Sequence, residues 1–293
     1  MGPADPMDPA PRPTSTELLG LAPDARALLL NADDFGMYPA VNSAVVESIE
    51  NGIAASCSLM VPCPAAAQAL ELLRERPHIP FGVHLTLVRD LPRLPWGPLS
   101  PKERVPSLLD GAGELYDPAG IPELLARARP AEVEREFRAQ IDAVLDAGLA
   151  PVHLDWHCLA DGGREDIRDL TLTLAAEYGL AARIWREPAR RALRRRGLPA
   201  LDHPFLDSFA LGLDDKAAHY AQLLRELPPG LTEWAVHPGL DDAHARAVDP
   251  GGWQIRSTDH AFLTSPQARD ILREEGIAVV DYQALRRIWT AAG

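Results

Sequence analysis

Cysteines and long apolar runs are both scarce in this chain of 293 residues. The three cysteines, Cys57, Cys63 and Cys158, show neither a zinc-finger spacing nor the dense pattern of a disulfide framework. Such usage is typical of a protein in a reducing cytoplasm, which is where we expect this chain. No stretch of about 18 apolar residues occurs, so the sequence predicts no membrane-spanning helix.

Basic residues are also outnumbered, because 29 lysines and arginines stand against 42 aspartates and glutamates, giving a formal net charge of −13. Nucleic acid and anionic membrane surfaces attract positively charged proteins, so this balance argues against both as main partners. The apolar fraction of 46% and the charged fraction of 24% are ordinary for a globular protein. Charge therefore excludes two classes of partner without indicating a substrate.

The N-terminal segment lacks the basic start and the apolar core of a signal peptide. It is rich in proline instead, and we expect a disordered leader over residues 1–24. The remainder, 25–293, is predicted to form a single domain. Within it, residues 88–130 are rich in proline and glycine and are predicted to form a loop insertion. Long loops in compact domains are often functional.

Short apolar runs alternate with amphipathic stretches along the chain, which is typical of βα units. The expected strands are 27–33, 53–61, 79–87, 151–157, 180–184, 231–237 and 277–280. The expected helices are 39–51, 64–76, 132–145, 166–178, 216–227, 265–275 and 282–290. No hairpin signal separates the strands, so the predicted fold class is α/β, either a barrel or a doubly wound parallel sheet.

The first expected strand ends in two adjacent carboxylates, Asp33 and Asp34, followed closely by Gly36. Parallel strands place their carboxyl ends where α/β enzymes build active sites. Two carboxylates this close repel one another, so one must be neutralised or their ionisation must be separated. A metal ion bound to one Asp would leave the other free as a base. The alternative is a solvated loop or a helix N-cap, where Asp is also favoured.

Histidines mark three other expected strands. His84 lies inside an apolar strand, and His237 ends another beside Pro and Gly. Between them, His153, Asp155 and His157 share one face of a strand by period-two alternation, where three ionisable groups are costly to bury without partners. Each pattern has a structural alternative, namely a hydrogen-bonded core histidine, a capping histidine and a solvated edge strand, respectively.

Asp and His side chains together suit Zn²⁺ or another first-row divalent ion. Three protein ligands leave a position for water, as in catalytic rather than structural sites. Histidine is also the side chain best matched to proton transfer near neutral pH. The four strand ends together therefore predict a catalytic metal site.

The same segments carry a resemblance to a known family. Four motifs resemble, in order, those of the YdjC-like carbohydrate deacetylases, which include the chitooligosaccharide deacetylases. They are Asn-Ala-Asp-Asp-Phe-Gly at 31–36, Gly-Val-His-Leu-Thr-Leu at 82–87, His-Leu-Asp-Trp-His at 153–157 and His-Pro-Gly at 237–239. The resemblance implies a distorted (β/α) barrel, similar to a TIM barrel, of the polysaccharide deacetylase type.

The resemblance also implies roles for the matched positions and one divalent metal ion, Zn²⁺ or Mg²⁺, as cofactor. The implied roles are metal ligand for Asp34, His84 and His157, general base for Asp33, general acid for His237, and supporting or substrate-binding group for His153, Asp155 and Arg256.

The implied activity is removal of the acetyl group from an N-acetylated sugar or oligosaccharide, with a small carbohydrate as the substrate. Two alternatives stay open at this point. One is metal-dependent hydrolysis of another bond, such as a phosphoester or a cyclic amide. The other is a non-catalytic sugar-binding protein on the same fold. A homodimer is also expected, because exposed barrel faces often pair.

One departure from the family lies directly after the last ligand position. Many relatives continue with further histidines, whereas this chain reads His-Cys-Leu at 157–159. The rim of the pocket therefore differs, and this leaves the substrate open. Trp96, Trp185 and Trp253 are candidates for stacking on a sugar ring, although tryptophan is more often a packing residue.

Overall fold

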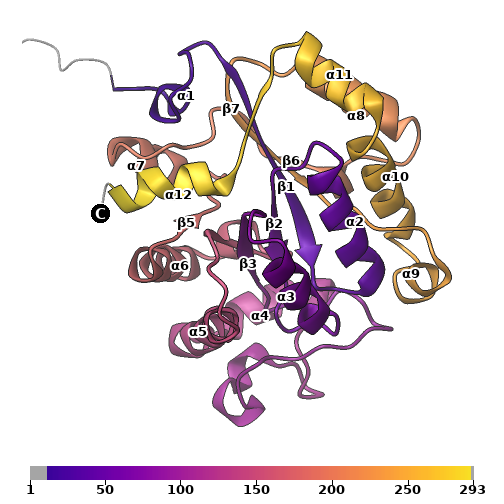
Figure 1. Ribbon diagram of the computed structural model, residues 1–293. Helices are drawn as coiled ribbons and strands as arrows, with labels where there is room; N and C mark the ends of the chain where they lie inside the picture. The colour runs from indigo at the N-terminus through magenta and orange to yellow at the C-terminus, as the bar shows by residue number, and fades with distance from the viewer. Residues whose placement is uncertain (1–11, 292–293) are drawn as a thin grey trace, which may run out of the picture.

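A curled parallel sheet forms the centre of the computed structural model, which describes residues 12–291 (Figure 1). The strands are β1 (Arg26–Phe35), β2 (Ser56–Leu59), β3 (Phe81–Leu85), β4 (His153–Trp156), β5 (Ala181–Ala182), β6 (Leu206–Asp207), β7 (Gly230–Val236) and β8 (Ala278–Val280). Their order in the sheet is β5-β4-β3-β2-β1-β7-β6, and β8 pairs with β1. Every strand pairing in this sheet is parallel, as the βα pattern predicts.

The long strand β1 organises the sheet. Along one edge it pairs with β7 from Arg26 to Ala32. On its other side, residues 27–29 pair with β8 and residues 31–35 pair with β2. Among the described strands no pairing joins β5 to β6, so the barrel is open between them. The predicted distorted (β/α) barrel is therefore confirmed as a curled, open parallel sheet rather than a closed ring.

Helices surround this sheet (Figure 1). The α-helices are α1 (Ser15–Leu18), α2 (Pro39–Glu50), α3 (Ala66–Glu75), α4 (Ile121–Arg127), α5 (Pro130–Asp146), α6 (Glu165–Tyr178), α7 (Ala189–Arg195), α8 (Lys216–Arg225), α9 (Ala243–Val248), α10 (Trp253–Leu263), α11 (Pro266–Glu274) and α12 (Tyr282–Ala291). The 3₁₀ helices are η1 (Lys102–Arg104), η2 (Pro106–Leu108), η3 (Pro118–Gly120), η4 (Ala160–Gly162) and η5 (Ser208–Ala210). Helices α9 and α10 and strand β6 lie in segments where no helix or strand was expected.

Side-chain alternation along β1 sends its residues in turn to the two faces of the curled sheet. Leu28 and Leu30 pack in the main hydrophobic core. Ala27 and Leu29 belong to a separate cluster at the amino end of the strands, which Tyr282 of α12 helps to close. The next residues on this inner face are polar, so the interior changes from apolar to charged toward the carboxyl ends of the strands. This alternation brings the acids predicted from the sequence to the functional end of the sheet.

Two segments differ from the sequence-based expectation. The predicted disordered leader over 1–24 contains α1, and Ser15 exchanges hydrogen bonds with the backbone of Ala200. This part of the leader is therefore ordered, while residues 1–11 lie outside the described residues. The segment 88–130 holds α4 and three short 3₁₀ helices rather than loop alone. No helix of the described chain is both long and apolar enough to cross a bilayer.

Candidate metal centre and active site

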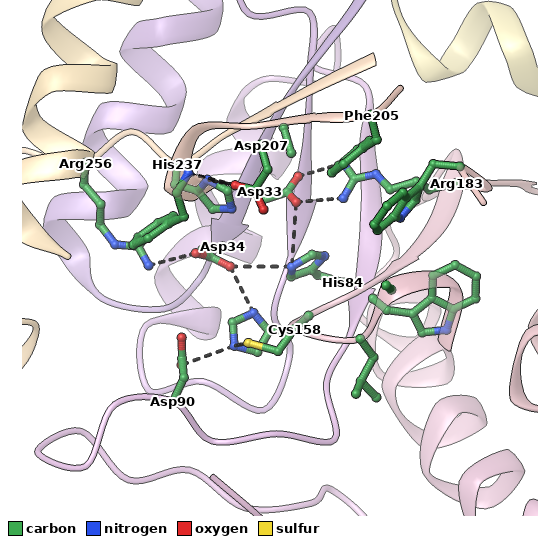
Figure 2. Close-up of a pocket in the computed structure, with 17 residues that line it drawn as sticks. Asp33, Asp34, His84, Asp90, Cys158, Arg183, Phe205, Asp207, His237 and Arg256 are labelled. Atoms are coloured by element: carbon green, nitrogen blue, oxygen red, sulfur yellow. Dashed lines mark hydrogen bonds and ion pairs between the residues drawn. The ribbon is translucent and has the colours of Figure 1, made fainter. Parts of the chain in front are cut away.

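The predicted site residues converge at the carboxyl ends of the strands. Asp33 and Asp34 end β1, His84 lies in β3, and His157 and His237 directly follow β4 and β7. All five line one cavity of about 420 Å³. Figure 2 shows Asp34 lying between the side chains of Arg256 and His84. The strand ends that are far apart in the sequence thus meet at one place, as the sequence predicts.

Asp34, His84 and His157 form a compact group of potential metal ligands. The Asp34 Oδ1 atom lies 3.2 Å from His157 Nδ1 and 3.5 Å from His84 Nε2. One ligand atom from each residue lies within 4.8 Å of the other two, and all three side chains are buried. Asp34 adopts φ of 68°, a left-handed conformation that costs a non-glycine residue about 1–3 kcal/mol. The donor set and its burial fit a divalent ion.

Arg256 of α10 neutralises the other oxygen of Asp34. Its Nη2 lies 2.8 Å from Asp34 Oδ2, and its Nε donates to Asp249 at 2.8 Å. Burial would raise the pKa of Asp34, but Arg256 and the two histidines outweigh it and hold that pKa well below its ordinary value. The carboxylate is therefore ionised and ready to bind a cation.

His84 is oriented by a carboxylate behind it. Its Nδ1 lies 2.8 Å from Asp155 Oδ1, which leaves Nε2 facing Asp34. Metal-ligating histidines commonly donate their second ring N–H to a carboxylate in this way. Burial opposes a charge on the ring, but Asp155 and Asp33 outweigh it and raise the pKa of His84 to about 9. Asp155 thus fixes the orientation of the His84 ring from below.

His153 lies deeper in the sheet than the other histidines. Ser58 separates it from the ligands, with hydroxyl contacts of 3.1 Å to His153 Nε2 and 2.5 Å to Asp155 Oδ2. The ring stacks on Tyr282 with centroids 3.6 Å apart. Gly82 makes room for it, since a Cβ there would lie 2.4 Å from the imidazole. His153 is therefore a packing and supporting residue at the floor of the site.

Asp33 points away from Asp34 into a bidentate contact with Arg183. The guanidinium donates from Nη1 to Oδ2 at 2.7 Å and from Nη2 to Oδ1 at 2.8 Å, and Asn31 donates to Oδ1 at 2.6 Å. Burial opposes ionisation of Asp33, but Arg183 outweighs it and lowers the pKa of this carboxyl. Oδ2 also lies 4.0 Å from His84 Nε2. Asp33 is therefore next to the group formed by Asp34, His84 and His157 but is not one of its members.

Arg183 forms ion pairs with three buried carboxylates. Besides Asp33 it contacts Asp155 at 3.1 Å and donates from Nε to Glu233 at 2.7 Å. Glu233 also accepts a hydrogen bond from the Tyr282 hydroxyl at 2.7 Å. Desolvation raises the pKa of Glu233 to about 7, against the opposing effect of Arg183. The network therefore retains a proton on Glu233 in slightly acidic solution.

This proton predicts a specific pH dependence of stability. The pKa of Glu233 is ordinarily 4.5 and is raised in the folded chain, so the folded state binds more protons between pH 4.5 and about 7. Protonated Glu233 therefore adds about 3 kcal/mol to the free energy of unfolding below pH 4.5, and this contribution is lost as pH rises through 7. Glu233→Gln, which keeps an acceptor for Arg183 and Tyr282, should remove this pH dependence of the free energy of unfolding. Urea unfolding of both chelated proteins from pH 4.5 to 8 measures the difference, and parallel profiles would contradict this prediction.

His237 lines the same cavity from the end of β7. Its Nδ1 lies 2.8 Å from Ser208 Oγ in η5, and its backbone N–H donates to Asp259 at 2.8 Å. The ring of Phe209 meets it edge-on at 4.8 Å. These contacts fix the imidazole at the cavity wall with 12% of its side chain exposed. His237 thus lies at the cavity but outside the group of potential metal ligands that contains Asp34.

The sequence did not single out Asp90 or assign a role to Arg183. Asp90 lies in the 88–130 segment, and its Oδ1 is 3.2 Å from His157 Nε2 (Figure 2). It carries no motif that distinguishes it from a solvated loop acid. Arg183 directly follows the two-residue strand β5, and its three acidic partners come from other strands. Only the expected strand end at 180–184 placed Arg183 near the site.

The sequence is similar to those of known proteins. A family model described as YdjC-like protein matches residues 27–274. A protein named carbohydrate deacetylase from Geobacillus stearothermophilus is 30% identical over 264 residues, covering 90% of this chain and 99% of that protein. A protein of the same name from Thermus thermophilus is 33% identical over 271 residues, covering 88% and 93%.

A solved structure also matches. It is an Enterococcus faecalis protein whose name refers to cellobiose-phosphate cleavage, and its crystal structure superposes with a TM-score of 0.74. The two sequences are 26% identical, and the match covers 89% of this chain and 99% of the other.

Proposed function

This chain belongs to the YdjC-like family, and from that premise we propose that it is a metal-dependent deacetylase of N-acetylated sugars or oligosaccharides. One observation carries the proposal: the buried ligands Asp34, His84 and His157 meet at the cavity that Asp33 and His237 also line. Hydrolysis of an acetamide needs an activated carbonyl, a base for water and an acid for the departing amine. This cavity brings together candidates for all three.

Asp34, His84 and His157 would hold one divalent ion. When bound, such an ion polarises the acyl oxygen and makes a neighbouring water more acidic. Two imidazoles and one carboxylate suit Zn²⁺ or another first-row ion better than Mg²⁺, which prefers oxygen ligands. Asp155 supports the set by fixing the ring orientation of His84. Arg256 supports it by occupying the second oxygen of Asp34.

Asp33 would accept the proton of the attacking water. Arg183 keeps it ionised at neutral pH, and Oδ2 retains a lone pair beyond the one that Arg183 uses, whereas Arg183 and Asn31 together occupy Oδ1. The same ion pair weakens Asp33 as a base, so the water must be acidified for the transfer to be efficient. Arg183 also prevents the carboxylate from rotating, which holds Oδ2 toward the ligand group.

His237 would protonate the amine as it leaves. Ser208 holds Nδ1, so the other ring nitrogen is the one available to donate a proton. Replacing His237 by Ala should lower kcat about 100-fold or more with little change in KM, because the acid acts in the transition state. Steady-state kinetics on one N-acetylated substrate measures this. Ser208→Ala, which leaves the imidazole in place, should be milder. A large rise in KM with unchanged kcat would contradict the role.

An aromatic wall beside the ligands suits a sugar ring. Trp185, Phe205 and Phe209 all line the cavity, and the first two stack with centroids 4.8 Å apart. Of the tryptophans considered from the sequence, Trp96 is 4% exposed and packs in the core. The cavity volume lies within the range of small-molecule sites. We propose that Trp185 contributes a stacking surface for the carbohydrate.

The phosphoester alternative is less well supported. It calls for basic groups that are free to clamp a phosphate and often for two metal ions. The two buried arginines at the cavity, Arg183 and Arg256, are both engaged by carboxylates. The non-catalytic alternative predicts loss of a ligand or of the base, and Asp33 and the three ligands are all in place. Deacetylation is therefore the function that we favour.

An acetate-release screen tests the proposal directly. Purified chain is treated with chelator, and Zn²⁺ or Mg²⁺ is added back before incubation with N-acetylglucosamine oligomers and their conjugates. We expect acetate only from metal-loaded protein. Metal binding without acetate from any substrate would favour the sugar-binding alternative. Two catalytic ions per chain with phosphate release would favour the phosphoesterase.

Three further features of the proposed enzyme rest on the sequence. We propose a small carbohydrate as substrate, a cytoplasmic location and a homodimer. The first agrees with the names of the relatives, which are carbohydrate deacetylases. Light scattering of the purified chain measures the oligomeric state.

A further inference from the structure

His157 presents its two ring nitrogens to two different groups of side chains. Nδ1 faces Asp34, in the set proposed above to hold the catalytic ion. Nε2 faces the opposite way, 3.2 Å from Asp90 Oδ1 and 3.3 Å from the thiol of Cys158 (Figure 2). One ligand atom each from Asp90, His157 and Cys158 lies within 4.8 Å of the other two. A second cluster of metal-binding groups therefore shares one imidazole with the first.

The buried oxygen of Asp90 indicates that this second cluster suits a cation. Asp90 Oδ1 is buried, and beside its 3.2 Å contact with His157 Nε2 it has no well-formed hydrogen bond within residues 12–291. A buried carboxylate oxygen beside an imidazole nitrogen is costly unless that ring is protonated or a cation binds between the two. In addition, Cys158 adopts φ of 59°, a strained conformation for a residue with a side chain. That conformation accompanies a thiol held beside the imidazole rather than one turned away from it.

We propose that Asp90, His157 and Cys158 form a second metal site, which takes a thiophilic divalent cation such as Zn²⁺ or Cd²⁺. Sulfur, imidazole and carboxylate are all ligands of Zn²⁺, and the thiolate selects against Mg²⁺. Cys158 is exposed and, like Asp90, lines the main cavity, so an ion can enter from solvent. Binding is a ligand exchange: the thiol releases its proton to water as the metal–sulfur bond forms, and nothing is oxidised or reduced.

The shared imidazole couples the two sites. A neutral imidazole has one lone pair available for a metal, on Nδ1 or on Nε2. An ion bound by Asp90 and Cys158 draws that lone pair to Nε2 and places the ring proton on Nδ1, which removes one ligand from the set of Asp34 and His84. The second site thus competes with the first, and an excess of thiophilic metal should inhibit the enzyme. This consequence rests on the proposed function, whereas metal binding at the second site does not.

Cadmium titration of chelated protein separates the two sites, because only the second contains sulfur. We expect the ultraviolet thiolate-to-Cd²⁺ absorption band in the wild type and its loss in Cys158→Ser. Cys63→Ala is the matched control: this thiol is buried and does not line the cavity, so the band should survive its removal. Asp90→Asn should weaken the apparent affinity about tenfold or more. A band that persists in Cys158→Ser, or that is absent from the wild type, would overturn the proposal.

The independence of the two sites is tested in the same way. His84→Ala removes a ligand from the first site only, so the cadmium band should remain, whereas His157→Ala should weaken it. Loss of the band in His84→Ala, with the fold intact by circular dichroism, would contradict a separate second site. If the deacetylase proposal fails, no variant releases acetate but the band is unaffected. If the second site fails, acetate release is retained and the band is missing.

Discussion

Asp34→Asn is expected to remove the catalytic ion from the protein and to abolish acetate release. The substitution keeps the size of the side chain and an oxygen for Arg256, but it takes away the negative charge on which His84 and His157 converge. A neutral amide oxygen is a much weaker ligand for a divalent cation, so metal affinity should fall about 100-fold or more, beyond the usual effect of losing a supporting group. Metal content after gel filtration and acetate release together measure the outcome.

A matched control is available in Asp249. It pairs with the same guanidinium, 2.8 Å from Arg256 Nε, but lies outside the ligand set. Asp249→Asn should therefore retain the ion, while sharing any loss of stability that comes from weakening a buried ion pair. His157→Ala provides a second test of the ligand set through a different residue. If Asp34→Asn and His157→Ala both retain metal and activity, the ligand assignment is wrong.

The parts of this site that could be predicted are those governed by period-two alternation. A buried strand that is apolar on both faces and ends in polar residues indicates that those residues lie at the carboxyl end of the sheet. Asp33 and Asp34 in β1 are an example. Alternation also placed His153, Asp155 and His157 on one face, and all three are on the inner side of the sheet. Parallel pairing brought the strand ends to one edge, because every connection returns the chain to the same end of the sheet.

The depth of each side chain could not be predicted in the same way. His153 and His157 lie two pleat repeats apart on the same face, yet one stacks on Tyr282 at the floor and the other faces Asp34. The relative stagger of neighbouring strands decides this, and β4 aligns His153 with Gly82 and Asp155 with His84. Register between parallel strands depends on long-range packing rather than on local residue type.

Loop residues were least accessible to prediction. Asp90 follows β3 without any periodic pattern, and its contact with His157 depends on how the 88–130 segment folds back over the strand ends. Arg183 could be placed near the site only through its strand, and its bidentate contact with Asp33 joins residues 150 positions apart. Such contacts are selected by charge complementarity in the folded interior, which a local pattern does not record.

Asp33→Asn should separate catalysis from metal binding. The amide cannot accept a proton, so we expect kcat to fall about 100- to 10,000-fold, the usual contribution of a general base. The ion should be retained, since Asp34, His84 and His157 are unchanged. Arg183 keeps Asp155 and Glu233 as partners, so the fold should also survive the loss of one of its three carboxylates.

Asp34→Asn is the matched comparison for Asp33→Asn. The two residues are adjacent and the chemical change is identical, so differences in metal content and kcat must come from their surroundings: a bidentate guanidinium for Asp33 and two imidazoles for Asp34. Metal content and single-turnover acetate release on both variants measure the separation. A metal-loaded Asp33→Asn protein with nearly full kcat would show that another group accepts the proton. Loss of metal from it would place Asp33 among the ligands instead, since Oδ2 lies 4.0 Å from His84 Nε2.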